Sequence, residues 1–460
     1  MLAPSPSRLR QLLTLAWPVV LSRSTQSVVG LSDALMVAPL GEYALAATVT
    51  GAINTFSLAM LPFGTVFIVQ SFSAQLTGRG DLLSARRYGA YGLLLSAATQ
   101  AVVLLALPFV GPVLGWFRYA PAVHTAMTDY MMIRLCSIGL LVAVEALGNW
   151  FAGMGNTQIQ MRASVITMVA NIALNWVFIY GHLGAPAMGV AGAALASSLA
   201  TALGLAWIGV AFWARQREIA GAAPWALKRA EFFRMLRFGV PNGLNWFMEL
   251  SAFTLFLNAV VAPLGTTVLA AMNVILQINS VSFMPAFGIA SAGAVLAGQA
   301  IGRAEPDEVG RVLRIAATVA VVWQGTVGLG YFLFPGPLMA FFEPPTGGAE
   351  LLRVGAAMLA VSAAWQAFDA IGLTVGETLR AAGDTAWCMW ARLLVAWLLF
   401  VPMSWLAVER LNGGALAAIW CIVVYVALLG IGFAWRFRSN AWRRIRLIEH
   451  DLVVEDSRPG

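Results

Sequence analysis

Apolar residues run along this chain in long stretches that do not alternate with polar ones, as between Leu393 and Leu406. A helix that crosses the hydrocarbon core of a bilayer needs about 20 mostly apolar residues. A membrane β-strand would instead alternate in polarity over roughly ten residues. Helices suit lipid because they satisfy every backbone polar group within their own segment. The pattern therefore predicts membrane-spanning helices.

Twelve such segments can be distinguished along the 460 residues. They lie near residues 11–33, 45–73, 89–115, 128–154, 161–181, 189–214, 235–261, 268–300, 312–341, 354–380, 387–408 and 414–436. Prolines and glycines interrupt several of them, which spanning helices tolerate better than soluble ones do. We therefore predict an all-α integral membrane protein with twelve transmembrane helices.

The composition supports this prediction. The chain is 60% hydrophobic and 11% charged, with a mean hydropathy of +0.79, whereas soluble domains are about 25% charged. A single soluble core stops growing beyond roughly 250–300 residues. The three cysteines and three histidines are scattered, so the sequence predicts neither a disulfide framework nor a metal site. We expect no cofactor other than a coupling ion.

The basic residues separate by side of the membrane. One alternate set of connections holds only Arg118, Arg353 and Arg410, whereas the other holds most of the arginines and the single lysine. Cytoplasmic connections are enriched in arginine and lysine. We therefore expect a multi-pass protein of the cell membrane, the inner membrane in a bacterium, with both termini in the cytoplasm.

The longest internal connection divides the chain into two halves of six helices. The predicted domains are an N-terminal lobe (1–214), a cytoplasmic linker (215–234), a C-terminal lobe (235–436) and a basic cytoplasmic tail (437–460). The tail also carries Trp442, Ile445 and Leu447, so it is a candidate to lie on the membrane surface.

The two halves repeat each other. Ala38-Pro39-Leu40-Gly41 recurs 224 positions later, from 38 to 262, and the same shift takes Phe63-Gly64 to Phe287-Gly288 and Gln75 to Gln299. Both halves begin on the same side, so they have the same topology. Secondary transporters often use internal repeats and bind substrate between them, near the middle of the membrane.

The repeated motifs resemble those of the multidrug and toxic compound extrusion (MATE) family, in its NorM-type branch. The features that carry the resemblance are Pro18 and Asp33 in the first helix, Gln75 to Gly78 and Gln299 to Gly302 after the second and eighth helices, and Gly155 to Thr157 and Gly383 to Thr385 after the fourth and tenth. The resemblance covers roughly residues 10–436. It implies two six-helix lobes that form a V and export amphipathic, often cationic compounds in exchange for Na⁺ or H⁺.

The resemblance also implies where the coupling ion binds. Glu249 and Asp369 match the acids of the second lobe, and Asp33, Asn171 and Asn175 match the polar cluster of the first lobe. Asn175 stands where some relatives have an aspartate. These five residues are our candidates for cation or proton coupling.

The acids within the predicted spans can be interpreted from physical chemistry alone. An acid at the centre of a spanning helix costs about 2.5–3.5 kcal/mol on insertion scales, so such residues mark functional sites by default. Glu249 and Asp369 have no basic residue close to them on their own segments. The alternative is neutralisation by an arginine elsewhere in the fold, and Arg23, Arg134 and Arg392 are candidates.

Two other acids have a more structural interpretation. Glu145 occupies the repeat position of Asp369, but Arg134 on the same segment suggests an ion pair in that lobe. Glu377 lies three residues before Arg380, and oppositely charged residues at this spacing pair on a helix surface.

Asn171 and Asn175 are four residues apart and therefore share a helix face. Their amide oxygens could bind a hard cation beside Asp33, and bonding between helices is an equally common role for asparagine in membranes. Aromatic and methionine side chains near the two acids of the second lobe could contact a flat cation. These cavity candidates are Phe247, Met248, Phe253, Met284, Phe287, Trp365 and Phe368.

The sequence thus favours a secondary antiporter for multidrug efflux that acts on small organic substrates within the lipid bilayer. The alternative is a lipid or lipid-linked oligosaccharide flippase of a related fold, although a cavity for a polyphosphate headgroup should be lined by cations. An intramembrane enzyme is disfavoured because no paired nucleophile and base is evident. We expect no nucleic-acid partner and a functional monomer.

Overall fold

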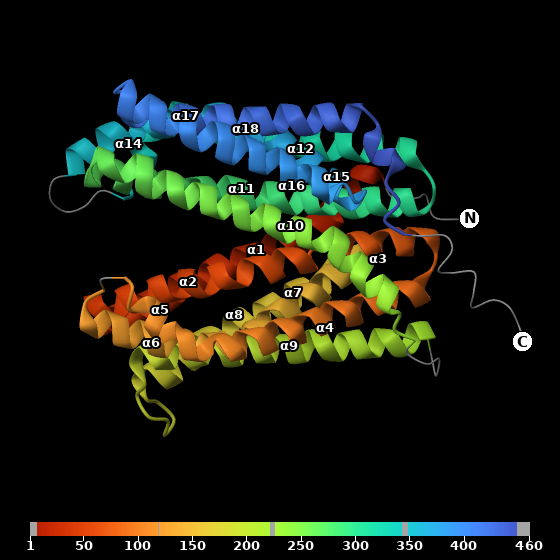
Figure 1. Cartoon of the computed structure of the whole chain (residues 1–460), viewed down its shortest axis with the longest axis horizontal. Helices are drawn as coiled ribbons and strands as arrows, with labels where there is room; N and C mark the ends of the chain where they lie inside the picture. Colours follow the sequence, from red (N-terminus) through yellow and green to blue (C-terminus); the bar gives the residue numbers. More distant parts are fainter. Residues whose placement is uncertain (1–6, 118, 221–225, 343–347, 449–460) are drawn as a thin grey trace, which may run out of the picture. The chain divides into compact units, whose positions relative to one another are not determined.

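The computed structural model describes residues 7–117, 119–220, 226–342 and 348–448. Helices joined by turns and short connections make up these ranges, and no strand is present in them. Figure 1 shows long helices joined by short connections. The predicted all-α class is therefore confirmed.

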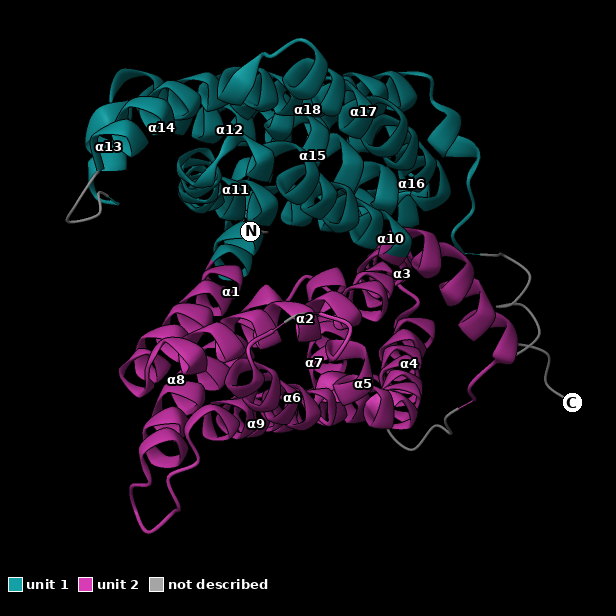
Figure 2. Cartoon of the chain, turned by 60° about the vertical axis from the view of Figure 1, so that its left-hand side comes forward, with its two compact units in different colours: residues 1–20, 244–460 teal, residues 21–243 magenta. Residues whose placement is uncertain are grey.

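The chain forms two compact units, shown in teal and magenta in Figure 2. Unit 1 comprises Met1–Val20 and Leu244–Gly460, and unit 2 comprises Leu21–Gly243. These bounds differ from those of the predicted lobes. The first turns of each half belong to the unit that contains most of the other half. The predicted linker is also shorter than expected, since helices extend to Ala220 and from Arg229. Residues 221–225 of the linker and 449–460 of the tail lie outside the described residues.

Unit 2 contains most helices of the first half. They are the end of α1 (Arg8–Val37), α2 (Glu42–Val66), α3 (Ile68–Arg79), α4 (Leu82–Ala106), α5 (Val110–Leu114), α6 (Pro121–Leu135), α7 (Ile138–Gly153), α8 (Thr157–Tyr180), α9 (Gly189–Ala220) and the start of α10 (Arg229–Phe256). Short 3₁₀ turns at Ala38–Leu40 and Leu107–Phe109 join some of them.

Unit 1 contains the start of α1, the end of α10 and most helices of the second half. The latter are α11 (Thr266–Gly302), α12 (Pro306–Leu333), α13 (Pro335–Ala340), α14 (Gly348–Ser362), α15 (Gln366–Ala381), α16 (Thr385–Leu393), α17 (Val401–Trp405) and α18 (Gly414–Arg438). Shorter helical turns at Leu257–Val261, Ala262–Leu264, Ala363–Trp365, Leu394–Phe400, Leu406–Arg410 and Ala441–Arg444 continue or connect them.

Each of the twelve predicted segments coincides with a helical stretch. Within the described ranges, ten helices are long and apolar enough to cross a membrane, or eleven if α6 and α7, bent by 46°, form one span. Although α1 has 30 residues, it is not among them, since polar residues dilute its apolar character. The count of twelve spans therefore stays a prediction.

Glycines allow the shared helices α1 and α10 to pack closely. A side-chain carbon added at Gly288 of α11 would lie 2.5 Å from Cγ2 of Val20 on α1. On α10, one added at Gly243 would lie 2.4 Å from the backbone oxygen of Leu61 on α2, and Gly239 makes a similar approach one turn earlier. Small residues four apart let helix backbones approach in membranes.

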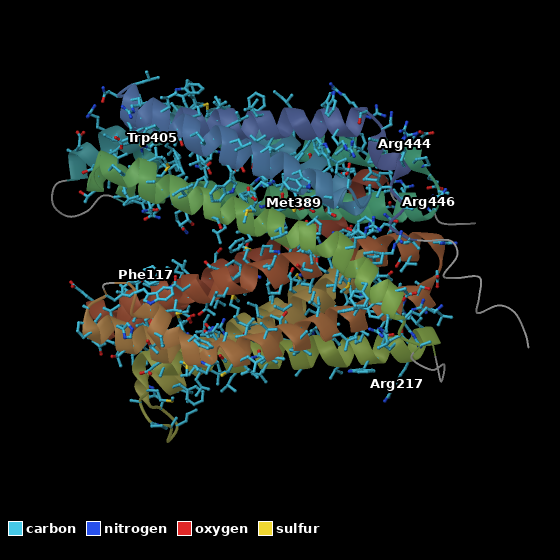
Figure 3. All side chains as sticks on the ribbon, in the orientation of Figure 1. Phe117, Arg217, Met389, Trp405, Arg444 and Arg446 are labelled. Atoms are coloured by element: carbon cyan, nitrogen blue, oxygen red, sulfur yellow. The ribbon has the colours of Figure 1, made fainter. Side chains whose placement is uncertain are left out.

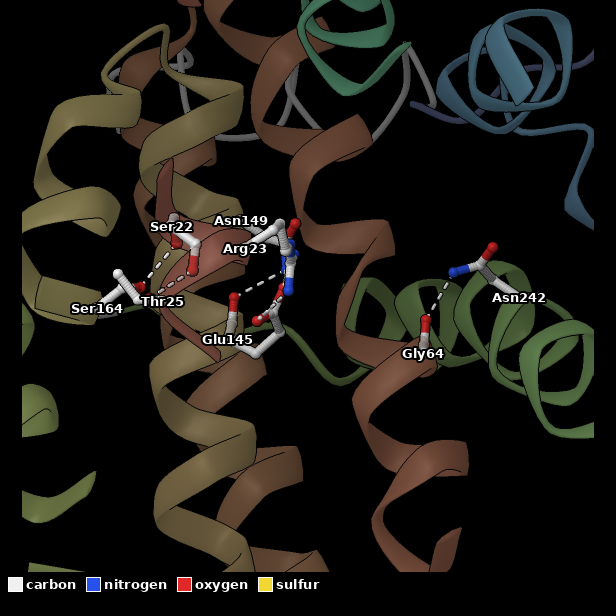
Figure 4. Close-up of polar contacts among 8 residues, drawn as sticks. All are labelled: Ser22, Arg23, Thr25, Gly64, Glu145, Asn149, Ser164 and Asn242. Carbon is white, nitrogen blue, oxygen red and sulfur yellow. Dashed lines mark hydrogen bonds and ion pairs between the residues drawn. The ribbon is translucent and has the colours of Figure 1, made fainter. Parts of the chain in front are cut away.

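The repeated Phe-Gly pairs lie at these two contacts. Gly288 faces α1, and the backbone oxygen of Gly64 accepts a hydrogen bond of 2.6 Å from Nδ2 of Asn242 on α10, shown in Figure 4. The repeat therefore preserves the place where the first helix of one half packs on the second helix of the other.

The candidate membrane-surface segment at the start of the tail packs against other parts of unit 1. Trp442 is buried, its ring stacks 5.3 Å from that of Phe437, and Leu447 is buried as well. Ile445 and Leu447 lie over Gly383, in the turn between α15 and α16. The fold therefore supplies an apolar surface of its own for Trp442 and Leu447, and a position of the segment at the membrane surface stays a prediction.

Within each unit, labelled arginines and aromatic residues lie at opposite ends in Figure 3. In unit 1, Arg444 and Arg446 lie at the end opposite Trp405, and in unit 2 Arg217 lies at the end opposite Phe117. This distribution fits the side separation of basic residues in the sequence.

Candidate ion-coupling site

The polar residues predicted for the first lobe form one connected cluster in unit 2. Asn175 on α8 donates a 2.6 Å hydrogen bond from Nδ2 to Oδ1 of Asp33 on α1, and its Nδ2 also lies 3.2 Å from Oδ1 of Asn171. Ser197 on α9 donates to Oδ2 of Asp33 at 3.2 Å and accepts from Asn171 at 3.0 Å. Both oxygens of the single carboxylate therefore accept hydrogen bonds.

This cluster borders a cavity of about 270 Å³ within unit 2. Asp33, Asn171 and Ser197 line the cavity, whereas Phe56, Phe63 and Tyr130 contribute aromatic surface and Arg134 a positive charge. Small-molecule pockets occupy about 300–1,000 Å³, so the cavity is close to the lower limit for an organic ligand.

The two acids predicted for the second lobe line one cavity in unit 1. Glu249 on α10 and Asp369 on α15 border a space of about 90 Å³, together with Asn245, Arg392 and Tyr425. A water molecule needs roughly 10–15 Å³ of such space, so the cavity has room for an ion and some water. It is too small for a drug-sized molecule.

Its sequence neighbours suggested that Glu249 is isolated from positive charge, but the structure gives it a basic partner. Arg392 on α16 forms an ion pair with Glu249 through Nη1 and Oε1. The Arg392 side chain is 14% exposed and that of Glu249 is 41% exposed. Sequence neighbours on one helix could not reveal this pair, because its two members lie more than a hundred residues apart.

Asp369 has a neutral partner instead. Gln324 on α12 donates a hydrogen bond of 2.8 Å from Nε2 to Oδ2 of Asp369. Across the described residues, no arginine, lysine or histidine lies within ion-pair distance of this carboxylate. Asp369 therefore has no ion pair of its own, as its sequence context predicted.

Asn245 supplies a further oxygen that the sequence analysis missed. It lies four residues before Glu249, so both share one face of α10. Asn245 is 2% exposed and lines the cavity, and its Oδ1 has no hydrogen-bond partner among the described residues. Carboxylate and amide oxygens are the ligands that hard cations prefer. The (i, i+4) spacing from Glu249 was a signal that could have identified it.

The other two acids singled out in the predicted spans, Glu145 and Glu377, each belong to an ion pair. Glu145 is buried, accepts from Nη2 of Arg23 at 2.6 Å and from Nδ2 of Asn149 at 2.9 Å, as Figure 4 shows. Its partner is therefore Arg23, not Arg134 on its own segment. Glu377 pairs with Arg380 at the predicted spacing of three residues.

The predicted substrate-contacting residues do not gather around the acids. Of the seven, only Phe287 lines the unit 1 cavity, where its ring contacts that of Trp246 with centroids 6.0 Å apart. The other six are distributed over unit 1: Phe253 and Trp365 pack in or against its apolar core, Phe247 and Phe368 are exposed, and Met248 and Met284 are partly buried. They are spread in this way because neighbouring helical residues point in different directions, and their contact with substrate stays a prediction.

Ionisable side chains enclosed by long apolar helices are typical of proteins that move ions or solutes across membranes. The helices, the repeat and the two polar cavities define this chain as a multi-pass membrane transporter. The family model MatE matches residues 18–177 and 246–406, which is more than half of the chain. The chain belongs to the MatE family.

Curated relatives cover nearly the whole chain. It is 28% identical over 448 residues to the probable multidrug resistance protein NorM of Rhizobium meliloti, covering 94% of this chain and 93% of the relative. It is 25% identical to that of Thermotoga maritima, covering 98% and 96%. These relatives support a multidrug efflux antiporter.

A solved structure described as an outward-facing multidrug resistance MATE family transporter of the MOP superfamily has the same fold. Its TM-score is 0.84 at 20% sequence identity, and the match covers 96% of this chain and 98% of the solved one. The two-lobe helical fold predicted from the repeat is therefore confirmed.

Proposed function

We propose that this transporter exports amphipathic organic cations in exchange for inward Na⁺ or H⁺, and that Glu249 and Asp369 bind the coupling ion. The observation that carries the proposal is that the two acids, from helices α10 and α15, line one cavity of about 90 Å³. A space of this size suits a proton, water or Na⁺ and excludes a drug-sized molecule.

The organic substrate needs a larger space, and the cavity of unit 2 is the better candidate. Its volume of about 270 Å³ and its lining by Phe56, Phe63 and Tyr130 suit a flat apolar molecule. Asp33 provides negative charge on the same wall, and the amides of Asn171 and Asn175 hold that carboxylate in position. We propose that Asp33 contributes to cation or proton binding in this unit.

Exchange then follows from thermodynamic linkage. If ion binding and substrate binding favour different conformations, each weakens the other by the same factor. An inward ion gradient therefore drives substrate outward. This mechanism needs no cofactor beyond the ion and no covalent reaction, and the proposed working form is a monomer in the bilayer.

Transport into and out of proteoliposomes tests the proposal directly. Purified protein is reconstituted, loaded with the fluorescent cation ethidium, and given an inward Na⁺ gradient or an inward H⁺ gradient in separate experiments. We expect one gradient to accelerate ethidium efflux relative to protein-free liposomes. An ethidium efflux rate that neither gradient changes would contradict coupling. Movement of a fluorescent lipid without ethidium transport would favour a flippase.

We further propose that both termini lie in the cytoplasm of the cell, at the inner membrane of a bacterium. The test uses a variant without Cys136, Cys388 and Cys421, the cysteines of the chain. Leu183, which is 83% exposed, lies in the connection between α8 and α9, and Arg217 lies near the end of α9 on the opposite predicted side. An impermeant thiol reagent added to whole cells should label Leu183→Cys and not Arg217→Cys. The reverse pattern would invert the orientation.

A further inference from the structure

The unit 1 cavity is lined by more acidic than basic side chains. Its charged lining residues are Glu249, Asp369, Glu377, Arg380 and Arg392. Glu377 and Arg380 pair with each other, which leaves two carboxylates and one guanidinium. With all groups ionised, the remaining charge is one negative unit, which a single monovalent cation would balance.

Arg392 has one acid as its direct partner. Its Nη1 pairs with Glu249, its side chain also interacts with that of Tyr425, its Nε has no hydrogen-bond partner among the described residues, and its guanidinium carbon lies 6.0 Å from the ring centroid of Phe433. An arginine within a spanning helix is costly and normally pairs with an acid or faces a water-filled cavity. The Glu249 carboxylate is therefore the principal compensation for Arg392.

Binding of a coupling ion at Glu249 would change this compensation. A buried charge that loses its partner is strongly destabilising. The other carboxylate of the cavity that has no ion-pair partner within the described part of the chain is Asp369. Arg392 therefore has a second acid available when Glu249 is protonated or bound to Na⁺.

We propose that Arg392 is a resident counter-cation: it competes with the coupling ion for Glu249 and limits the cavity to one monovalent cation in each transport cycle. This inference rests on the proposed ion-coupling role of Glu249 and Asp369. It adds that the resident charge keeps ion binding weak enough for release, because an incoming cation must displace the guanidinium before it gains the full attraction of Glu249.

Charge counting makes a distinctive prediction for combined variants. Glu249→Gln leaves Asp369 and Arg392, a neutral set that should no longer bind the ion. Glu249→Gln combined with Arg392→Met leaves Asp369 alone and restores one negative charge. We expect the double variant to regain an ion affinity within roughly tenfold of the wild type, although it carries one more substitution.

Arg392→Met alone should leave two uncompensated carboxylates. We expect the half-saturating concentration of Na⁺ or H⁺ to fall by at least roughly tenfold, because a positive charge in contact with the site has been removed. Turnover should also slow, since ion release becomes harder. Arg392→Lys keeps the charge and should retain single-ion binding.

The measurements use full-length protein. Purified variants are titrated with NaCl by calorimetry and with acid in a proton-uptake assay, and the number of ions per cycle is obtained from the reversal potential of ethidium transport in proteoliposomes. Arg23→Met is the matched control, because it removes a buried arginine from an ion pair in unit 2. That control should lower stability without tightening ion binding.

The outcomes separate this inference from the proposed function. Loss of ion binding in Glu249→Gln without recovery in the double variant would overturn the role of Arg392 and leave the two acids as the coupling site. Unchanged ion binding in both Glu249→Gln and Asp369→Asn would contradict the coupling site itself. If Arg392→Met does not fold, the double variant decides alone, because replacing both members of a buried pair is usually tolerated.

Discussion

The two units compensate the charge of their buried acids in different ways, although Glu145 and Asp369 occupy equivalent positions of the repeat. In unit 2, the acid at the repeat position, Glu145, is fully engaged by Arg23 and Asn149, and the separate acid Asp33 is held by neutral hydrogen-bond donors. In unit 1, the corresponding acid Asp369 accepts a hydrogen bond from a glutamine, and the nearby arginine pairs with another acid.

This difference teaches that a repeat preserves the position of an acid without preserving its role. A carboxylate with a buried arginine and an amide around it has its charge compensated and contributes to the fold. A pair of carboxylates that share one arginine keeps an uncompensated charge in a small cavity. The second arrangement suits reversible binding of a cation, because binding completes the balance of charge.

The largest expected effect comes from neutralising the acids of unit 1. Glu249→Gln and Asp369→Asn should each abolish gradient-driven ethidium efflux in proteoliposomes, since each removes the charge that the coupling ion balances. The variant with both substitutions should be little worse than either single one, because residues that act as a unit are not additive. Wild-type efflux in either variant, at matched protein levels, would exclude that carboxylate from coupling.

A smaller effect is expected for the acid of unit 2 that lacks an arginine partner. Asp33→Asn should lower ethidium efflux several-fold, because it removes the negative charge from the wall of the larger cavity while keeping the shape of the side chain. Initial efflux rates over a range of ethidium concentrations would measure this. An unchanged concentration dependence would mean that Asp33 serves only the hydrogen-bond cluster.

Asn245 sharpens the comparison by distinguishing the two coupling ions. If its amide oxygen binds Na⁺ beside Glu249, Asn245→Leu should raise the half-saturating Na⁺ concentration roughly tenfold, in line with the energy of a polar contact to a charged group. Proton-driven efflux should be affected much less, since a proton needs no amide ligand. Parallel assays with each gradient test this, and equal losses under both gradients would mean that Asn245 has a packing role.

The smallest effect on transport is expected for the buried pair of unit 2. Glu145→Gln leaves Arg23 without its acid, which should lower stability by about 3–5 kcal/mol. Ethidium efflux per correctly folded molecule should nevertheless stay close to that of the wild type. Thermal unfolding measures the loss of stability, and ethidium efflux of the same preparation measures transport. Abolished efflux in well-folded protein would mean that Glu145 takes part in ion coupling, as proposed for Asp369.

Much of the fold could be predicted from the sequence, because its signals are local. A spanning helix satisfies its own backbone, so an apolar stretch of sufficient length identifies it without knowledge of its neighbours. The boundaries of α8 (Thr157–Tyr180) and α18 (Gly414–Arg438) differ from the predicted segments by only a few residues. The repeat at one constant shift likewise identified the two halves.

The exchange of helix starts between the units could not be predicted in the same way. The closeness of Gly288 to Val20, and of Gly243 to Leu61, depends on which helix surfaces meet. The repeated Phe-Gly pair marked these places without revealing what they contact. For the same reason the sequence did not show that Trp442 would pack against Phe437.

The sequence by itself determined which residues are candidates for the site, because an acid in an apolar segment is too costly to be incidental. It therefore identified Asp33, Glu249 and Asp369, and the spacing of Asn171 and Asn175. Only the tertiary structure decided their partners: Arg392 for Glu249, Gln324 for Asp369 and Arg23 for Glu145. Electrostatic compensation acts over a few ångströms between helices far apart in sequence, and the balance of charge in each cavity is set there.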